Sequence, residues 1–289
     1  MVASVTRLYP FYSGCGSVAN SRVVRLLAGE DSGLDWVKLR QGPFLRVMLG
    51  DYLSNTVYFS REWDPKISWV CERLLRPGDT ALDIGANLGL NTCQMAALVG
   101  PTGRVHSFEP NPMVGGLLRQ SLRRNNYTHV TLHPVGLGDE ECELDLTVPL
   151  RNQCLGTLAR DEEGTKIKVP VKTLSGVLAR EELRRVRLLK IDVEGFEERV
   201  FRGAEQFFKQ VRPDAILFEL NKYDGAFEDH PTVRFLRRHG YDFLMLPQRL
   251  MRMSAERFTA ESLRGSPSND LIAAPRGPLF DEVAAQLGA

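Results

Sequence analysis

The sequence predicts an α/β fold with an open, largely parallel sheet, and three observations lead to this. From about residue 80 onward, short apolar runs typical of buried strands alternate with segments of helical periodicity. A glycine-rich turn follows the first of these runs and opens a helix. Acidic residues end several of the expected strands. In such a sheet ligands bind beyond the carboxyl ends of the strands, where the strand order reverses, so we expect a ligand site there.

The first strand and its turn form the stretch Thr80–Gly89, which reads TALDIGANLG. The apolar run reaches Asp83 and then breaks into a turn that contains Gly85 and Gly89. Residues 90–98 follow, with helix formers and apolar positions at helical spacing. Such a turn lets a ligand approach the backbone and directs the N-terminus of the helix at it.

A second acid, Glu109, ends the next expected strand, residues 104–108. A carboxylate at that place suits the two hydroxyls of a ribose, which predicts a nucleoside-containing ligand. The spacing from Gly85 to Gly89 does not match the dinucleotide fingerprint, and a Walker phosphate loop is absent. Asp83 suits an ammonium better than a pyrophosphate. S-adenosylmethionine carries an ammonium, a carboxylate, a sulfonium and a ribose but no phosphate, so we expect it as the cofactor and S-adenosylhomocysteine as its product.

The alternation of strands and helices continues to the end of the core. Further strands are expected at 130–135, 188–191, 215–218, 241–246 and 270–274, which makes seven core strands in all. Helices are expected at 67–75, 113–126, 174–184, 197–210 and 230–239. Alternating apolar and polar residues predict an inserted β-hairpin at 142–148 and 165–171. The strand ends would bring five acids to one face: Asp83, Glu109, Asp139, Asp192 and Glu219.

Two segments flank the expected core, which spans residues 65–275. Residues 1–64 form an N-terminal extension, with a short helix expected at 17–29 and a small hairpin at 36–49. This extension could be a lid, a dimer contact or a substrate wall, or it could simply pack over a sheet edge. Residues 276–289 form a tail that could hold a short helix.

Composition narrows the classes of partner and location. The 289 residues carry a formal net charge of +1, so there is no overall basic field for nucleic acid. The five cysteines form no C-x-x-C pair, which indicates reduced thiols in a cytoplasmic protein. No apolar run approaches the roughly 18 residues of a membrane span, and no signal peptide is recognisable. We expect a cytoplasmic protein that binds neither nucleic acid nor membrane; a homodimer stays open.

The motifs, taken in chain order, resemble those of the FkbM-type S-adenosylmethionine-dependent methyltransferases. The chain carries LDIGANLGLNT, HSFEPNP, VGLGDEE and LLKIDVEGFEERVFRGA, with NDLIAAP near its end. The similarity covers residues 65–275, and Gly136 stands where the family often has alanine. It implies a class I methyltransferase (Rossmann-like) fold of seven strands, the last one antiparallel. It also implies methyl transfer, usually to a hydroxyl of a natural product or a sugar-containing metabolite.

The resemblance also implies site residues by position. The methionine side of the cofactor would lie on Asp83, Gly85, Ala86, Asn87 and Gly89. Thr92 would be a partner of the cofactor's carboxylate. Glu109 would bind the ribose, with Pro110 and Asn111 beside the adenine. The adenine would be flanked by Leu137, Gly138 and Asp139; Asp139 could accept its amine or could belong to an ordinary Gly-Asp turn. Asp192 would lie where cofactor and acceptor meet.

Methyl transfer from a sulfonium is an in-line displacement, so the enzyme chiefly aligns the reacting atoms. An alcohol acceptor also has to lose a proton, for which a base is useful. The candidate bases are Asp192, Glu194, Glu219 and His230, of which Asp192 lies nearest the expected transfer point. Each could instead have a structural role, and Glu194 could cap the following helix. Asp192 and Glu219 could contribute to a magnesium site, but a third ligand is not evident and we expect no metal.

Two other function classes stay open. One is methylation of a macromolecule or a nitrogen atom, although the chain has no [DNS]-P-P-Y stretch and no basic groove with stacking aromatics. The other is a scaffold that has kept the fold without catalysis, which would normally show damage in the glycine-rich turn. That turn is intact here, which favours an enzyme over a scaffold. The small hydroxyl-bearing acceptor is what the resemblance implies.

Overall fold

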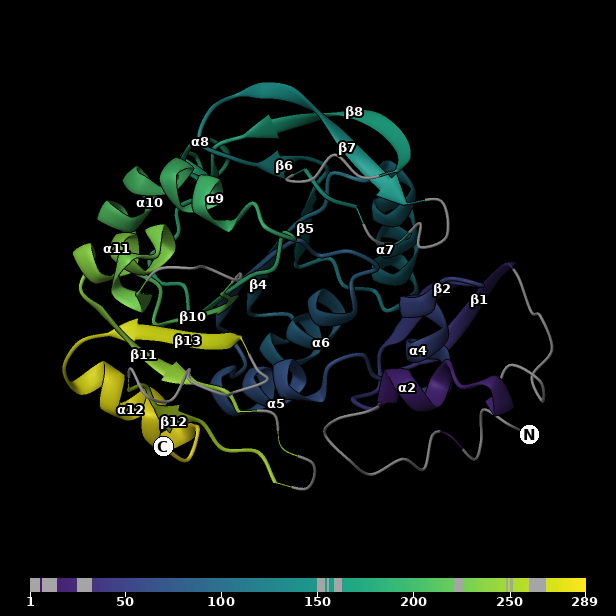
Figure 1. Cartoon of the computed structure of the whole chain (residues 1–289), viewed down its shortest axis with the longest axis horizontal. Coiled ribbons are helices and arrows are strands. Elements are labelled where there is room, and N and C mark those ends of the chain that lie inside the picture. The colour runs from purple at the N-terminus through teal and green to yellow at the C-terminus, as the bar shows by residue number, and fades with distance from the viewer. Residues whose placement is uncertain are drawn as a thin grey trace.

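The structure is a computed structural model of the chain. It describes residues 6, 15–24, 33–149, 154, 156–158, 163–220, 226–247, 249, 252–259 and 269–289. An eight-stranded sheet forms the centre, with strand order β12-β11-β13-β10-β9-β3-β4-β5 (Figure 1). Its strands are β3 (Thr80–Ile84), β4 (Arg104–Phe108), β5 (Val130–His133), β9 (Leu188–Ile191), β10 (Ala215–Glu219), β11 (Tyr241–Met245), β12 (Glu256–Arg257) and β13 (Asp270–Pro275).

The sheet has the topology expected from the sequence. Strands β5, β4, β3, β9 and β10 run parallel, whereas β13 is antiparallel to both of its neighbours, β10 and β11. The seven predicted core strands and the antiparallel last strand are therefore confirmed, and the two-residue edge strand β12 is an addition. From β3 the chain proceeds outward to β4 and β5, and it then returns to place β9 on the other side of β3. The strand order reverses between β3 and β9, so a ligand site is expected at their carboxyl ends.

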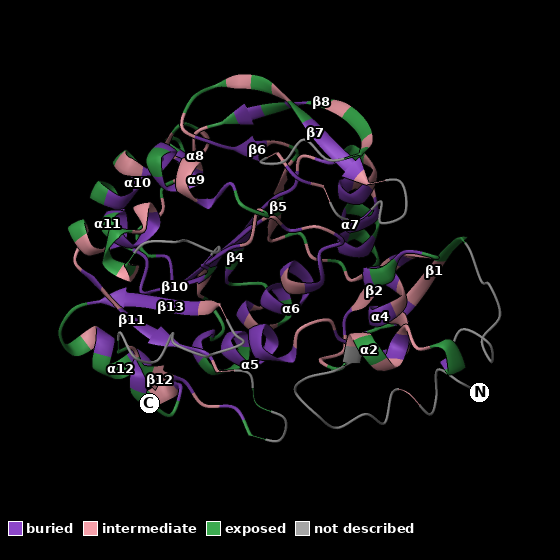
Figure 2. Ribbon diagram, in the orientation of Figure 1, coloured by how far each residue is buried: buried purple, intermediate pink, exposed green. Residues whose placement is uncertain are grey.

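Helices cover both faces of the sheet. One apolar core lies between the sheet and α8 (Leu174–Leu178), α9 (Glu197–Gly203), α10 (Glu205–Gln210) and α11 (Pro231–Arg238). The other lies between the sheet and α5 (Pro65–Leu74), α6 (Leu90–Val99) and α12 (Pro278–Gln286). Successive residues of β3 point to opposite cores, Leu82 to the first and Ala81 to the second. Figure 2 shows the central strands buried along most of their length.

Two predicted helices differ in the structure. The helix predicted at 174–184 ends at Leu178, and the one predicted at 197–210 is divided into α9 and α10. Ser175 explains the division, because its hydroxyl donates to the carbonyl of Gly203 (2.8 Å) and accepts from the amide of Phe207 (3.1 Å). Those two backbone groups would otherwise bond to each other, so the side chain interrupts the helical ladder.

The predicted inserted hairpin is present as β7 (Cys142–Pro149) and β8 (Gly164–Lys172), which pair antiparallel. β6 (Gly136–Leu137) joins β8 to make a small three-stranded sheet. The strand predicted at 130–135 therefore ends earlier, as β5, and the chain leaves the central sheet after it.

The N-terminal part packs beside the core at the right of Figure 1. It contains α2 (Cys15–Ala19), the predicted hairpin β1 (Gly33–Lys38) and β2 (Phe44–Leu49), and an unpredicted helix, α4 (Tyr52–Ser60). The helix predicted at 17–29 is partly present, and residues 25–29 lie outside the described residues. Side chains of β1, β2 and α4 share one apolar cluster with α6 and with α7 (Pro112–Arg124). This cluster holds the N-terminal part against the helix that follows the glycine-rich turn.

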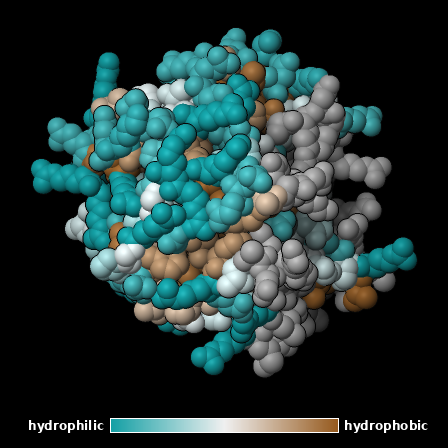
Figure 3. All heavy atoms as spheres, turned by 60° about the vertical axis from the view of Figure 1, so that its left-hand side comes forward, coloured by the Kyte–Doolittle hydropathy of each residue, from teal (hydrophilic) through white to brown (hydrophobic). Residues whose placement is uncertain are grey.

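Two further findings concern membrane-spanning helices and the surface. No helix within the described ranges is both long enough and apolar enough to cross a membrane. In the view of Figure 3, hydrophilic side chains cover most of the described surface, with a smaller band of hydrophobic residues between them.

Candidate functional site

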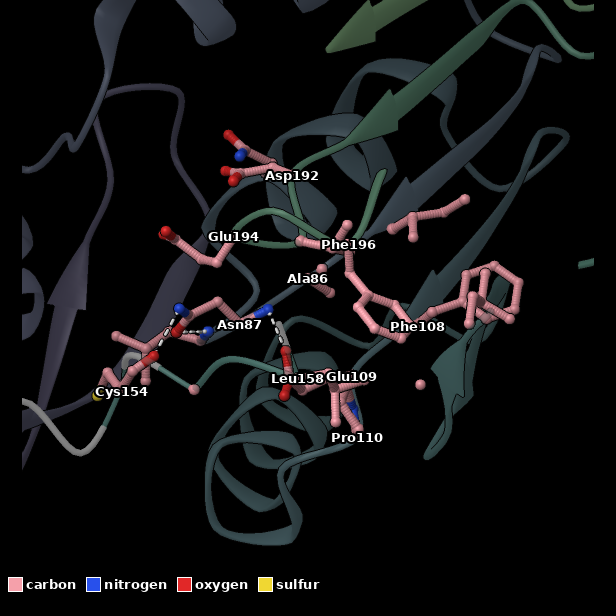
Figure 4. Close-up of a pocket in the computed structure, with 18 of the residues that line it drawn as sticks. Ala86, Asn87, Phe108, Glu109, Pro110, Cys154, Leu158, Asp192, Glu194 and Phe196 are labelled. Carbon is pink, nitrogen blue, oxygen red and sulfur yellow. Dashed lines mark hydrogen bonds between the residues drawn. The ribbon is translucent and has the colours of Figure 1, made fainter. Parts of the chain in front are cut away.

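A pocket lies at the carboxyl ends of β3, β4 and β9, where the strand order reverses. The glycine-rich turn after β3 forms one wall and the end of β4 another, while β6 and the inserted segment add apolar side chains. Figure 4 shows Glu109 and Asp192 on opposite sides of this pocket, with Ala86 and Asn87 between them. The N-terminal part contributes Leu53 and Trp63 to the lining. The pocket therefore lies where sheet topology predicts a ligand.

The turn after β3 requires glycine at two positions. Gly85 has a φ of 78°, and a Cβ there would lie 1.8 Å from the carbonyl oxygen of Asp192. Gly89 has a φ of 86°, and its Cβ would lie 2.1 Å from a methyl group of Leu118. The turn can therefore press against both β9 and α7 only because these residues lack side chains. The amides of Gly85 and Ala86 donate to the carbonyl of Phe108 (3.1 and 2.9 Å), which fixes the turn to the end of β4.

Glu109 is buried at the end of β4 and faces the pocket. Its two carboxylate oxygens accept hydrogen bonds from the backbone amides of Asn87 and Asn111, each at 2.8 Å. Burial raises the pKa of Glu109 to about 7, although the two amides act in the opposite direction. A carboxylate offers about four lone-pair sites, so each oxygen can still accept one further hydrogen bond. Glu109 is thus rigidly held and ready for two hydroxyl donors.

Asp83 and Thr92 lie beneath the turn rather than in the pocket wall. Asp83 is fully buried, and the hydroxyl of Thr92 donates to it at 2.6 Å. On the other side, the ammonium of Lys190 lies 3.3 Å from the second oxygen of Asp83. Neither Asp83 nor Thr92 lines the pocket, so the direct contacts expected for them with a cofactor stay predictions. In the structure their hydrogen bond links β3 to α6, the two elements that the turn connects.

The expected adenine side is only partly assembled around the pocket. Pro110 and Leu137 line it, together with the rings of Phe108 and Phe196 (Figure 4). The remaining members of this predicted group lie outside the lining: Asn111, Gly138 and Asp139.

Two of these three have other partners. The side chain of Asn111 caps α7 by accepting from the amide of Met113 at 3.1 Å. Asp139 pairs with Arg199 at 2.6 Å. Although burial raises its pKa, the hydrogen bond and charge of Arg199 lower the pKa of Asp139 below its usual range. A contact between Asp139 and an adenine amine therefore stays a prediction.

Three of the four candidate bases occupy different places. Asp192 lines the pocket at the end of β9, and its side chain is 40% exposed. Glu219 ends β10, the neighbouring strand, where it is exposed and does not line the pocket. Burial, and then the charges of Asp192 and Asp270, raise the pKa of Glu219 to about 7. His230 is the N-cap of α11, where its Nδ1 accepts from the amide of Thr232 at 3.2 Å, and it does not line the pocket.

At the start of α9, Glu197 takes the role that the sequence analysis allowed for Glu194. Glu194, which could have capped α9, has a φ of 53° and lines the pocket. Instead, Glu197 in the first turn of α9 accepts from the amides of Val193 and Gly195, both at 3.2 Å. Glu194 is thereby left at the pocket rim, beside Asp192 (Figure 4).

Sequence reasoning missed several residues of the pocket. Lys190 is the most informative, and a lysine within the apolar strand LLKI was the signal that could have found it. Cys154 could not have been found in this way, because it comes from the inserted segment. Its carbonyl accepts from the side-chain amide of Asn87 at 2.7 Å, and its amide donates to Asp51 at 3.2 Å. Within the described part of the chain, no group of three or more His, Cys, Asp or Glu side chains could hold a metal ion.

Comparisons of the sequence with known proteins place the chain among methyltransferases. Residues 83–243 match the family model described as the methyltransferase FkbM domain. The 31-O-demethyl-FK506 methyltransferase FkbM of Streptomyces tacrolimicus is 31% identical over 202 residues, which cover 58% of this chain and 74% of that protein. Methyltransferase 1 of Beauveria bassiana is 31% identical over 178 residues, which cover 54% and 71% of the two chains.

The chain is also similar to a solved structure. The crystal structure of methyltransferase FkbM from Methylobacillus flagellatus is 15% identical, with a TM-score of 0.42. The match covers 77% of this chain and 53% of that one.

Proposed function

Because the chain belongs to the FkbM methyltransferase family, we propose that it uses S-adenosylmethionine to methylate a hydroxyl group of a small natural product or sugar-containing metabolite. The observation that carries the cofactor assignment is Glu109, a buried carboxylate at the pocket wall whose two oxygens each accept one hydrogen bond from the described residues and can accept one more. That arrangement suits the two hydroxyls of a ribose.

The remaining pocket residues fit the other parts of this cofactor. Pro110, Leu137 and Phe196 offer apolar surface to an adenine ring beside the ribose position. Gly85 and Ala86 of the turn line the pocket, where their backbone can contact a methionine moiety. Asp192 and Glu194 present negative charge to an ammonium or a sulfonium at the opposite end of the pocket. When bound, S-adenosylmethionine supplies a methyl group already activated by its sulfonium.

Glu219 is the residue best suited to take the proton of an alcohol acceptor. Its side chain is exposed at the end of the strand next to β9, outside the pocket lining, and its raised pKa of about 7 matches a general base that works near neutral pH. Asp192, by contrast, is paired with Lys190 at 3.6 Å. In this assignment Glu219 accepts the hydroxyl proton while Asp192 orients the reacting groups. The Streptomyces tacrolimicus relative is named for a 31-O-demethyl-FK506 substrate, which supports an oxygen acceptor here.

Thermal unfolding with added ligands tests the cofactor assignment. At about 100 times Kd, a ligand of the native state adds roughly 2.7 kcal/mol, which for a chain of this size raises the Tm by roughly 5–10 °C. We expect this shift with S-adenosylmethionine and S-adenosylhomocysteine but not with NAD, and we expect Glu109→Gln to reduce it. Glu143→Gln, a change at an exposed residue of β7, is the matched control. Folded wild-type protein that responds to neither compound would reject the assignment and favour a scaffold.

The acceptor is tested with S-adenosylmethionine labelled in its methyl group. Hydroxyl-bearing natural products and sugars are compared with amines, peptides and nucleic acids, and labelled products are identified by mass spectrometry. Label on an oxygen atom of a small molecule is the expected result. Label confined to nitrogen or to macromolecules would reject the hydroxyl assignment while leaving the cofactor assignment intact.

A further inference from the structure

Lys190 is a buried cation in a strand that is otherwise apolar. β9 reads Leu-Leu-Lys-Ile and all four residues are buried; the Lys190 side chain is 3% exposed. Hydrogen-bonded strands, β3 and β10, flank β9 on both sides. An ammonium is costly to bury unless partners replace the water that it loses. The partners of Lys190 therefore indicate what it is for.

The Lys190 ammonium has three oxygen partners, which lie on two different strand ends. It lies 3.3 Å from Asp83, its lateral neighbour on β3, and it donates to the carbonyl of Gly85 at 3.2 Å. It also lies 3.6 Å from Asp192, two residues further along its own strand. One side chain thus connects the turn after β3 with the end of β9, across the point where the strand order reverses.

The two carboxylates differ in what they leave for a ligand. Asp83 is fully buried and already accepts a hydrogen bond from Thr92, so it balances the charge of Lys190 inside the protein and is not exposed to a ligand. Asp192 is 40% exposed and lines the pocket. Within the described residues, Lys190 is the only cation paired with Asp192. Burial lowers the pKa of Lys190, but Asp83 and Asp192 raise it by more, so the side chain is a charged ammonium.

We propose that Lys190 is a positioning residue of the transferase, which fixes the Asp192 carboxylate and the Gly85 carbonyl at the end of the pocket that receives the methionine moiety. The proposal rests on the proposed function, because it needs the pocket to bind S-adenosylmethionine. In this proposal Asp83 is the buried counter-ion of Lys190 and does not contact the cofactor directly. It also separates the strand-end acids: Asp192 is tied to a cation, whereas Glu219 on the next strand is not paired with Lys190.

A double-mutant cycle separates positioning from a purely structural role. The affinity for S-adenosylmethionine is measured by calorimetry for wild type, Lys190→Met, Asp192→Ala and the double variant. If Lys190 acts through Asp192, Lys190→Met weakens binding about fivefold or more when Asp192 is present and less than about twofold when it is absent. A structural role would instead weaken binding by the same factor in both backgrounds, because independent effects add in free energy.

Lys190→Met leaves Asp83 without its counter-ion, which can unfold the chain. Lys190→Arg is therefore carried through the same cycle, since it keeps a cation beside Asp83 while its planar group cannot reproduce the contacts of an ammonium. Non-additive losses for either substitution support the proposal, and additive losses for the substitutions that fold overturn it.

Lys66→Met is the matched control. Lys66 is also a largely buried lysine between two acids, Asp64 at 3.5 Å and Asp270, but it does not line the pocket. Its effect on binding should be the same with and without Asp192. Wild-type protein that binds no S-adenosylmethionine would overturn the proposed function and this inference together. Wild-type binding with an additive cycle would overturn this inference alone.

Discussion

Gly85→Ala is the substitution that most severely tests the close approach of the turn to β9. A Cβ at this position would lie 1.8 Å from the carbonyl oxygen of Asp192, and the φ of 78° is left-handed. That conformation costs a residue with a side chain roughly 1–2 kcal/mol. To relieve the clash, the ends of β3 and β9 must also move apart. This movement breaks the hydrogen bond from the amide of Asp192 to the carbonyl of Ile84 (3.0 Å), which is worth about 1 kcal/mol. We expect a loss of about 3 kcal/mol in the free energy of unfolding.

Thermal and denaturant unfolding measure this loss. For a chain of this size, it corresponds to a fall of roughly 6–12 °C in Tm, and binding of S-adenosylmethionine should be lost as well. Gly116→Ala is the control, because Gly116 lies in α7 with nothing within 4 Å of an added Cβ. That change should raise stability by about 0.5–1 kcal/mol, the helical advantage of alanine over glycine. A Gly85→Ala protein with wild-type Tm and wild-type affinity would refute the reasoning.

Three further predictions concern titratable groups. Glu109 has a folded-state pKa of about 7, above its usual 4.5, so the stability that it contributes below pH 4.5 is lost as the pH rises through 7. The affinity for the cofactor should instead rise as the pH increases through 7, by up to about tenfold per pH unit, because the ionised carboxylate is the better hydrogen-bond acceptor. Calorimetry that shows an affinity independent of pH would contradict this. Glu219→Gln should lower kcat about 10²–10⁴-fold and abolish the rise of kcat through pH 7, while calorimetry shows little change in cofactor affinity; a normal pH–rate profile would exclude Glu219 as the base. His230→Ala should remove the N-cap of α11, lower stability by about 1 kcal/mol in denaturant unfolding and leave kcat unchanged; a large loss of kcat would instead return His230 to catalysis.

The topology was predictable because it depends on strong, local patterns. The buried runs around Leu82 and Leu189, and the glycines that a turn against β9 requires, leave few alternatives to an open parallel sheet. Helix α4 was not predictable in this way, because its sequence, YLSNTVYFS, contains many residues of weak helical propensity. It forms because Asp51 caps it, accepting from the amide of Leu53 at 3.0 Å, and because its apolar side packs on the core.

The site was predictable to the level of strand ends, but not to the direction of each side chain. Asp83 and Glu109 both end or nearly end a strand, yet Glu109 faces the pocket while Asp83 turns inward to Lys190 and Thr92. Alternation does not explain the difference, because Asp83 pairs with Ser107, two residues before Glu109, so both acids fall on the same face. They differ in their place along the strands: Asp83 lies within β3, whereas Glu109 follows the last residue of β4. Asp139 is drawn away by Arg199, a partner 60 residues distant in sequence. Contacts of that kind follow from the tertiary fold and have no local signal.

The most direct test of the central claim is a calorimetric titration of S-adenosylmethionine into the purified chain, with Glu109→Gln titrated in parallel. The account predicts saturable binding at one site per chain, weakened about tenfold or more in the variant because a hydroxyl acceptor of the ribose is lost, and each 1.4 kcal/mol is tenfold. Glu143→Gln should bind as wild type does. Binding that is unchanged by Glu109→Gln, or absent from folded wild-type protein, would contradict the claim that the pocket at the carboxyl ends of β3, β4 and β9 is the cofactor site.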